Sequence, residues 1–355
     1  MGSFRRGFRN RSPLVLIVAA VLIVPTLLGI EQFFASGAWT VVPMKYWMRK
    51  ASDDYTYLSW TVGAEKRHPP KLPAVYLLGG STAREAITSG ETLARQVKED
   101  GGPSIVAYDF GSMNQNFAQS LDIVDNIPAK DAMVLVGVNL GRFTSDRGSS
   151  FIQARGRELL LKSPYLQRYV ADKYGKEKYT RTILPGIFSY LASFLQQRGW
   201  AVGDLFTGRE YGQHRYNRKS DHTVKQKERM VKLWNQKRYP VFKHNLQFNL
   251  DMLEQLVVRA QQRGVRVVLL ELPHNRALVG DRFDRAISEY REPVKALAEK
   301  YDVPYVDFNP ELPLKNDDFH DLSHLNESGR VIWQAALARE LVRLLDAEDP
   351  GGSGG

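Results

Sequence analysis

Five short, mostly apolar segments recur along the chain and alternate with stretches of helical periodicity. The expected strands are residues 74–80, 104–111, 132–139, 265–273 and 303–308. The expected helices are residues 91–100, 116–128, 242–264, 284–301 and 326–347. Strands that lack a polar face and alternate with helices are typical of a parallel sheet covered by helices on both sides. The sequence therefore predicts an α/β fold around a central parallel sheet.

The N-terminal region carries a second strong signal, an uncharged apolar run at residues 13–30. Four arginines and no acidic residue precede this run. A helix of this length, with the apolar residues that flank it, can cross a hydrocarbon core of about 30 Å. Basic residues before the span favour a cytoplasmic N-terminus and an extracytoplasmic body. The alternative is a cleaved signal peptide, whose apolar core is usually shorter; both alternatives export the body.

These signals divide the 355 residues into parts of different composition. The expected parts are a cytoplasmic basic tail (1–12), a transmembrane signal-anchor (13–30), a juxtamembrane connector (31–72), an α/β domain (73–349) and a linker or tag remnant (350–355). Within the domain, residues 144–240 separate the third and fourth expected strands. A stretch of that length is too long for a bare loop, so we expect a helical insertion there.

Basic residues are concentrated in the insertion. Residues 151–240 hold 19 Lys and Arg against 7 Asp and Glu, whereas the whole chain has a formal net charge of +10. This surplus favours an anionic membrane surface, an acidic glycan or teichoic-acid substrate, or an acidic partner. A solvated helical face would carry the same charges. The chain has no nucleic-acid recognition motif, so no nucleic-acid partner is expected.

An uncharged run inside the insertion, residues 183–195, is too short to span a membrane. Such a run can pack on the protein core, cover a functional site, or rest on a membrane or a membrane partner. Packing on the core is the interpretation that we favour.

Glycines and polar residues follow several expected strands, at the edge where parallel sheets gather functional groups. Ser81 follows the first strand in "LLGGSTARE", Gly111 the second and Asn139 the third. The glycine spacing around Ser81 fits neither a dinucleotide site, nor a P-loop, nor a G-x-S-x-G elbow. Ser81 is either a helix N-cap or a nucleophile. We expect Glu85, four residues later, to be a solvated or capping carboxylate.

A serine nucleophile needs a base and an acid that orients the base. The segment "DDFHDLSHLNESG", residues 317–329, contains two Asp-x-x-His pairs. We favour Asp321 with His324, because this pair leads directly into the last expected helix; Asp317 with His320 is the alternative. A nearby acid fixes the imidazole tautomer while the ring faces the serine.

Other polar residues give weaker signals. His274 and Asn275 follow the fourth strand and either line the site or lie in a loop. The remaining histidines share no metal-ligand spacing, so no metal is expected. The chain has no cysteine, which excludes disulfides, zinc-thiolate sites and a cysteine nucleophile.

Taken together in chain order, these motifs resemble the blocks of the SGNH (GDSL-like) hydrolase superfamily, over about residues 73–143 and 243–345. The matching residues are Gly79, Gly80 and Ser81; Gly111 in "DFGSMNQN"; Gly137, Val138 and Asn139; and Asp321 with His324. The resemblance implies a flavodoxin-like three-layer sandwich, with Ser81 as nucleophile, His324 as base and Asp321 as its orienting acid. It also implies an oxyanion hole made by Ser81, Gly111 and Asn139, and no cofactor. Gly80 departs from the family, which usually has aspartate there.

Within that superfamily, a single N-terminal anchor and a large insertion resemble proteins that acylate or deacylate cell-envelope polymers. The resemblance implies a membrane-anchored serine esterase or O-acyltransferase that forms an acyl-serine on an acylated polysaccharide or other envelope polymer. It places the catalytic domain outside the cytoplasm, as in a periplasm, beside a membrane-bound O-acyltransferase partner. The alternative function is a catalytically inactive SGNH-like scaffold of such an acyltransferase complex, and the Gly80 departure is compatible with it.

Overall fold

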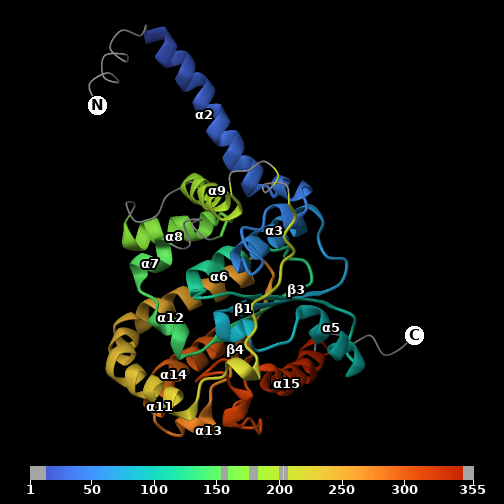
Figure 1. Cartoon of the computed structure of the whole chain (residues 1–355), viewed down its shortest axis with the longest axis vertical. Coiled ribbons are helices and arrows are strands. Elements are labelled where there is room, and N and C mark those ends of the chain that lie inside the picture. Colours follow the sequence, from blue (N-terminus) through green and yellow to red (C-terminus); the bar gives the residue numbers. More distant parts are fainter. Residues whose placement is uncertain (1–12, 153–158, 176–182, 200–202, 204–206, 347–355) are drawn as a thin grey trace.

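The structure is a computed structural model that describes residues 13–152, 159–175, 183–199, 203 and 207–346. The expected basic tail (1–12) and linker or tag remnant (350–355) lie outside the described residues. A five-stranded sheet forms the centre of the molecule (Figure 1), and all its strands are parallel, in the order β2-β1-β3-β4-β5. The strands are β1 Ala74–Gly79, β2 Val106–Gly111, β3 Ala132–Val138, β4 Arg266–Glu271 and β5 Tyr305–Asp307. This result confirms the predicted α/β class and the parallel sheet.

Helices cover both faces of the sheet because alternate residues of its apolar strands point to opposite sides. Tyr76 and Leu78 of β1 belong to one core cluster, whereas Val75 and Leu77 belong to the other. The first cluster includes residues of α6 (Phe117–Val124), α12 (Tyr239–Gln262) and α14 (Asp284–Lys300). The second includes residues of α5 (Gly90–Glu99) and α15 (Glu327–Asp346). Each expected helix between the strands is therefore present, with ends shifted by a few residues.

At the N-terminus, the helix α2 spans Pro13–Ala35 and projects from the body (Figure 1). Within the described residues it is the one helix long and apolar enough to cross a membrane, which is consistent with a single-pass anchor. The helix continues past residue 30, the end expected from the sequence. Its last turn belongs to the body, where Phe34 is buried.

The segment expected to be a connector, residues 31–72, is in part an integral piece of the body. It contains two short 3₁₀ turns, η1 (Ala38–Val41) and η2 (Met44–Tyr46), and the helix α3 (Asp54–Arg67). Leu58 and Val62 of α3 are buried in the core cluster that also holds Tyr76. The periodicity of this short segment was too weak to predict that packing, since tertiary contacts stabilise most of such a helix.

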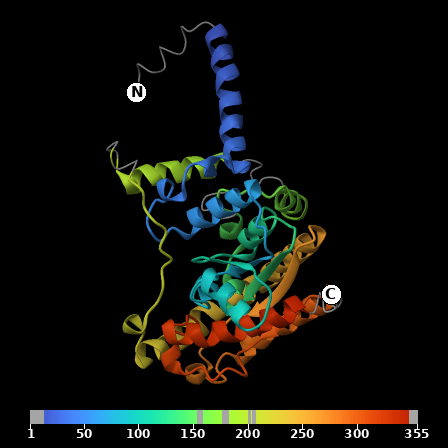
Figure 2. The same ribbon diagram turned by 90° about the vertical axis from the view of Figure 1, so that its right-hand side faces the viewer.

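The described part of residues 144–240 is mostly helical, as expected. After the 3₁₀ segment η3 (Leu140–Thr144), its elements are α7 (Arg147–Ile152), α8 (Pro164–Tyr174), α9 (Leu184–Arg198), η6 (Arg218–Ser220), α11 (Val224–Leu233) and a π-helical turn at Trp234–Arg238 that leads into α12. Residues 207–217, before η6, run extended along the body from the end near α2 to the opposite end (Figure 2). This segment therefore contributes to both ends of the molecule.

Candidate active site

Ser81 lies where β1 passes into the short helix α4 (Ser81–Arg84). The preceding Gly79 permits a tight turn, because a Cβ atom there would lie 2.6 Å from the Cβ of Ala83. Gly80 is the N-cap of α4 and has no side chain to cap it. Ser81 is therefore the first residue of the helix and not its N-cap, and it lines a cavity at the carboxyl edge of the sheet.

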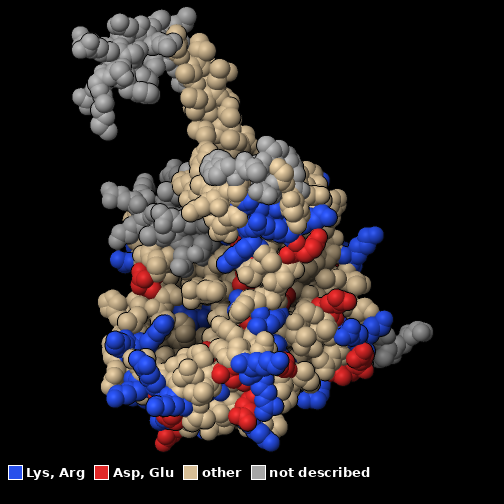
Figure 3. Space-filling model, in the orientation of Figure 1, with Lys and Arg blue, Asp and Glu red and all other residues tan. Residues whose placement is uncertain are grey.

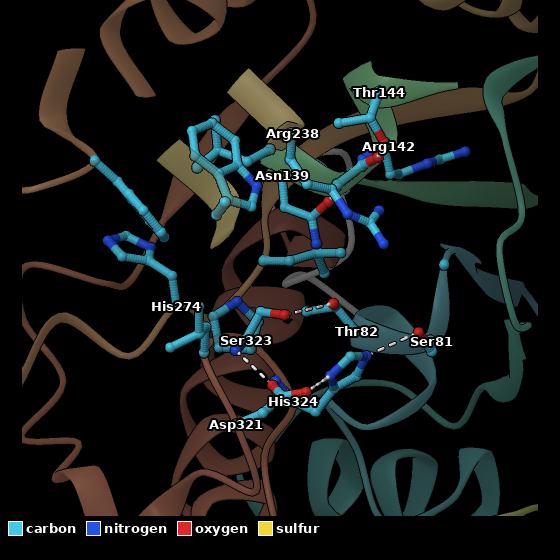
Figure 4. Close-up of a pocket in the computed structure, with 18 of the residues that line it drawn as sticks. Ser81, Thr82, Asn139, Arg142, Thr144, Arg238, His274, Asp321, Ser323 and His324 are labelled. Atoms are coloured by element: carbon cyan, nitrogen blue, oxygen red, sulfur yellow. Dashed lines mark hydrogen bonds and ion pairs between the residues drawn. The ribbon is translucent and has the colours of Figure 1, made fainter. Parts of the chain in front are cut away.

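The structure brings Ser81, His324 and Asp321 together in one hydrogen-bonded chain (Figure 4). The Ser81 Oγ lies 2.8 Å from the His324 Nε2, and the His324 Nδ1 lies 2.7 Å from the Asp321 Oδ2. The second carboxylate oxygen, Asp321 Oδ1, accepts hydrogen bonds from the backbone N–H groups of Ser323 and His324, both at 2.9 Å. This arrangement lets the imidazole accept a proton from the serine while the carboxylate fixes its orientation.

Two opposing effects set the charge of Asp321. Burial alone would raise its pKa, but the hydrogen bond and charge of the His324 ring, together with the two backbone N–H groups, hold the pKa well below its usual range. Asp321 is therefore ionised at every physiological pH and can stabilise a protonated His324.

His320, the alternative histidine, lies away from Ser81. Its ring stacks on Tyr216 with the ring centroids 3.9 Å apart, and its Nδ1 lies 3.7 Å from the Asp221 Oδ1. Its backbone N–H donates to the carbonyl of His324 at 2.8 Å. Of the two Asp-x-x-His pairs, the one that reaches the serine is therefore Asp321 with His324.

Asn139 reaches the same space from the end of β3 (Figure 4). Its side-chain oxygen accepts the backbone N–H of Arg142 at 3.1 Å and so caps the 3₁₀ segment η3. This bond fixes the amide and turns its N–H₂ group toward the cavity that Asn139 lines. Asn139 can therefore both close a turn and donate a hydrogen bond into the site.

The geometry does not support the expected role of Gly111 as an oxyanion donor. Its N–H donates to the Asp109 Oδ1 at 3.1 Å, and the residue is not among those that line the cavity. A Cβ at Gly111 would lie 2.3 Å from the backbone nitrogen of Arg84. The glycine is thus required for the close approach of β2 to α4, which is a packing role.

Two later residues of the same loop line the cavity in its place, Asn114 and Gln115. Asn114 has a φ of 58°, a left-handed conformation that non-glycine residues adopt rarely and often at functional sites. Gln115 is buried and donates to the carbonyl of Phe110 at 2.8 Å. Both lie in the "DFGSMNQN" motif, so this loop reaches the cavity through Asn114 and Gln115 and not through Gly111.

The cavity has a volume of about 500 Å³ and extends well beyond the serine. One wall comes from α11 and the π-helical turn, which contribute Met230, Leu233, Trp234 and Arg238. π-helical turns occur frequently at functional sites. Sequence reasoning missed these residues, because the irregular turn leaves no signal in a helical pattern.

A second group of titratable residues lines the cavity at the end of β4. Burial raises the pKa of Glu271 to about 7, and the hydroxyl groups of Tyr290 and Tyr305 donate to this carboxyl. Burial lowers the pKa of His274 to about 4, so this histidine is neutral at neutral pH. The neighbouring Asn275 is fully buried and donates to the carbonyl of Asp321 at 3.1 Å, which supports the position of the acid.

Glu85 is not solvated, contrary to the expectation from its position in the sequence. It is fully buried, and its carboxylate pairs with Arg84 at 3.1 Å and with Arg330 at 2.8 Å. Arg84 also pairs with Asp54 of α3 at 3.0 Å. Breaking one partner of such a buried network leaves an uncompensated charge, so this cluster fixes α4, and with it Ser81, against α3 and α15.

No group of three or more His, Asp or Glu suited to a metal ion occurs within the described ranges. No protein-family model matches the chain, and neither does any curated protein.

Proposed function

We propose that the protein is a membrane-anchored serine esterase or O-acyltransferase of the SGNH type. The observation that carries this proposal is the Ser81–His324–Asp321 chain of hydrogen bonds at the edge of a sizeable cavity. The strand order 2-1-3-4-5 with helices on both faces supports a flavodoxin-like three-layer sandwich with residues 144–240 as an insertion. Sites in such sheets form at the carboxyl ends of the strands.

In the proposed reaction, the Ser81 Oγ attacks the carbonyl carbon of an ester while His324 Nε2 takes the serine proton. Asp321 stabilises the imidazolium that forms. The negative charge of the tetrahedral intermediate is stabilised by the Asn139 amide and the Ser81 N–H. His324 then protonates the leaving alcohol, and an acyl-Ser81 remains until water or a sugar hydroxyl takes the acyl group.

The distribution of charge supports an acidic polymer as the substrate. Exposed cations with no ion-pair partner among the described residues gather over α11 and the π-helical turn that follows it (Figure 3). They are Lys225, Arg229, Lys232, Lys237 and Arg238. Arg238 also lines the cavity, so we call these five residues the basic rim. A basic rim beside a cavity concentrates an anionic chain near the serine.

The position of the basic rim favours a polymer over a membrane surface. The helix α11, which lines the cavity, and the neighbouring α13 (Arg276–Val279) lie at the end of the body farthest from α2 (Figures 1 and 2). If α2 crosses the membrane with its N-terminus in the cytoplasm, the basic rim points away from the lipid, toward the extracytoplasmic space. We propose a membrane-bound O-acyltransferase in the same membrane as the partner that supplies or shares the acyl group.

Covalent labelling tests the proposed chemistry. Purified full-length protein in detergent should react with a fluorophosphonate, and mass spectrometry should locate the adduct on Ser81. Ser81→Ala should abolish both labelling and ester turnover while the circular dichroism spectrum stays unchanged. An unlabelled Ser81, under conditions that label a control esterase, would overturn the enzyme proposal in favour of the inactive scaffold.

A further inference from the structure

The helix α9 lies at the end of the body from which α2 emerges. It contacts α2, and its axis runs across that of α2 in both views (Figures 1 and 2). The helix α8 lies below it in Figure 1, so α9 is the outermost of the described helices of the body on this side. A membrane that α2 crosses along its normal would therefore have α9 lying parallel to its plane.

The joint between α2 and the body is tightly packed, so the position of α9 relative to the membrane follows from that of α2. Glu31, in the last turns of α2, forms an ion pair with Lys162 at 2.8 Å. The Lys66 ammonium of α3 donates to the carbonyl of Ala35 at 3.2 Å, at the helix end where a cation is favoured. Gly37 then turns the chain with a φ of 77°, and a Cβ there would lie 2.3 Å from the carbonyl oxygen of Gly63.

One face of α9 is packed and the other is exposed without charge. Ile187 and Tyr190 are buried in a cluster with Phe34 and Trp39. On the other face Phe188 is 47% exposed, and Ala192, one turn later, is exposed too. No charged residue occurs between Leu184 and Gln197. Surface helices in contact with water usually carry charged residues on their outer face, and α9 does not.

Other exposed apolar residues continue this surface at the base of α2. Phe33 is 40% exposed, Val41 61% and Val42 37%. The indole N–H groups of Trp47 and Trp60 nearby donate to the carbonyls of Trp39 and Val42. Tryptophans with one polar and one apolar side are enriched where proteins meet the membrane interface.

We infer that α9, together with Phe33, Val41 and Val42, forms a platform that lies in the interfacial layer of the bilayer beside the anchor. The occupant of this surface is lipid, because the same end of the body holds the emerging anchor and because the platform has no charge with which to select a soluble partner. Helices of this kind enter the boundary between headgroups and acyl chains by about 5–10 Å. The inference rests on membrane anchoring by α2 and not on the chemistry at Ser81.

Site-directed fluorescence on the full chain tests the platform, and the absence of cysteine makes each label unique. Phe188→Cys and Ala192→Cys, each labelled with an environment-sensitive dye, should be reconstituted in nanodiscs of phosphatidylcholine and phosphatidylglycerol without any other protein. The matched controls are Val21→Cys in the exposed middle of α2 and Asn235→Cys on the exposed π-helical turn. Quenchers attached to lipids at a shallow and at a deep position measure depth.

The platform predicts that the dyes at 188 and 192 are quenched most by the shallow quencher, with blue-shifted emission. The dye at 21 should be quenched most by the deep quencher and the dye at 235 by neither. If the dyes at 188 and 192 behave like the dye at 235 while that at 21 is deep, the platform is wrong and the anchor stands. If the dye at 21 is also unquenched, the anchor and the platform both fail, while labelling of Ser81 by fluorophosphonate still judges the chemistry separately.

Discussion

The two ends of the body differ in how they use charge. At the cavity end, where α11 and the π-helical turn line the cavity, ionised side chains face both the interior and the solvent: Asp321 lies inside and the basic rim outside. At the anchor end, the exposed face of α9 carries no charged residue, and Phe188 on it is 47% exposed. Charge around the cavity suits chemistry on a water-borne polyanion, and the lack of charge on the exposed face of α9 suits contact with lipid. The same domain therefore presents a charged surface at one end and an uncharged helical face at the other.

The largest expected effect comes from the triad, and it should be confined to the cavity end. His324→Ala should lower turnover of a small ester by about three orders of magnitude or more, because it removes the base. Asp321→Asn should be severe as well, since the wrong tautomer of His324 would face Ser81. His320→Ala serves as the matched control and should cost far less, because its ring packs on Tyr216 and not on Ser81.

Steady-state kinetics with p-nitrophenyl acetate measure the chemistry at the cavity end. Quantitative membrane fractionation measures how well the anchor end holds the protein in the membrane. All three variants should remain in the membrane fraction to the same extent as the native chain. Equal losses of turnover in the His320 and His324 variants would contradict the assignment of the base.

The next effect concerns the basic rim. The combined change Lys225→Glu, Lys232→Glu and Lys237→Glu should raise KM for a partly acetylated polyuronate several-fold, and up to about tenfold, because the local field reverses sign. Turnover of a small neutral ester should change far less. The control is Lys130→Glu, an exposed lysine that precedes β3 at the amino edge of the sheet. Added salt should reduce the difference between variant and native chain, since mobile ions screen exposed charges; a difference that does not depend on salt would argue against an electrostatic role.

Two buried carboxyl groups, one lining the cavity and one outside it, should each make the stability of the fold depend on pH. Burial raises the pKa of Glu271, which lines the cavity, to about 7, and also that of Glu65 of α3, outside the cavity, to about 7. The folded state therefore holds each proton more tightly than the unfolded state. The stability that each contributes is fully present below the unfolded pKa near 4.5 and is lost as the pH rises through about 7.

Glu271→Gln and Glu65→Gln should each flatten the fall in the free energy of unfolding between pH 5 and 8, by on the order of 2 kcal/mol. Chemical denaturation in detergent at several pH values measures this change. Glu271→Gln should in addition alter ester turnover, whereas Glu65→Gln should not. If Glu65→Gln changed turnover as much as Glu271→Gln, the boundary drawn between the two regions would be wrong.

The smallest effect is expected at Gly80, and a glycine of the anchor end provides the contrast. Gly80→Ala should leave stability within about 0.5 kcal/mol, because nothing lies within 4 Å of a Cβ there and its φ of −69° suits any residue. Gly37→Ala should destabilise by more than about 1 kcal/mol, since its φ is 77° and Gly63 leaves no room. Thermal unfolding of both variants decides this prediction, and a large loss at Gly80 would show that the turn before Ser81 needs glycine itself.

Much of the fold followed from local pattern. Apolar segments bounded by glycine or polar residues identified all five strands, because buried parallel strands need no polar face. The spacing of Asp321 and His324 was equally local, since a separation of three residues in one turn can place both side chains on one side, but Asp317 and His320 have the same spacing. The approach of Asp321 and His324 to Ser81 could be predicted only from the order of the motifs along the chain. That order places both segments at the carboxyl edge of the sheet.

Other features depended on contacts between segments far apart in the chain, and the sequence did not disclose them. Gly111 looked like a donor at a strand end, but packing against Arg84 explains it better. Glu85 looked like a solvated or capping carboxylate, yet it is buried and pairs with two arginines, one of them 245 residues away. The cavity wall at Trp234 and Arg238 depends on an irregular helical turn that no periodicity marks.

The sequence by itself determined the class of the fold and the apolar N-terminal helix, because each is encoded by short-range periodicity. The three residues of the hydrogen-bonded chain were expected only through the resemblance of the motif order to a known superfamily. The tertiary structure decided which end of the body holds the cavity, which surface α9 exposes and which buried charges meet. These outcomes depend on how helices separated by many residues pack across the sheet. Such packing is set by the sum of many weak contacts and desolvation costs, and no single stretch of the chain contains it.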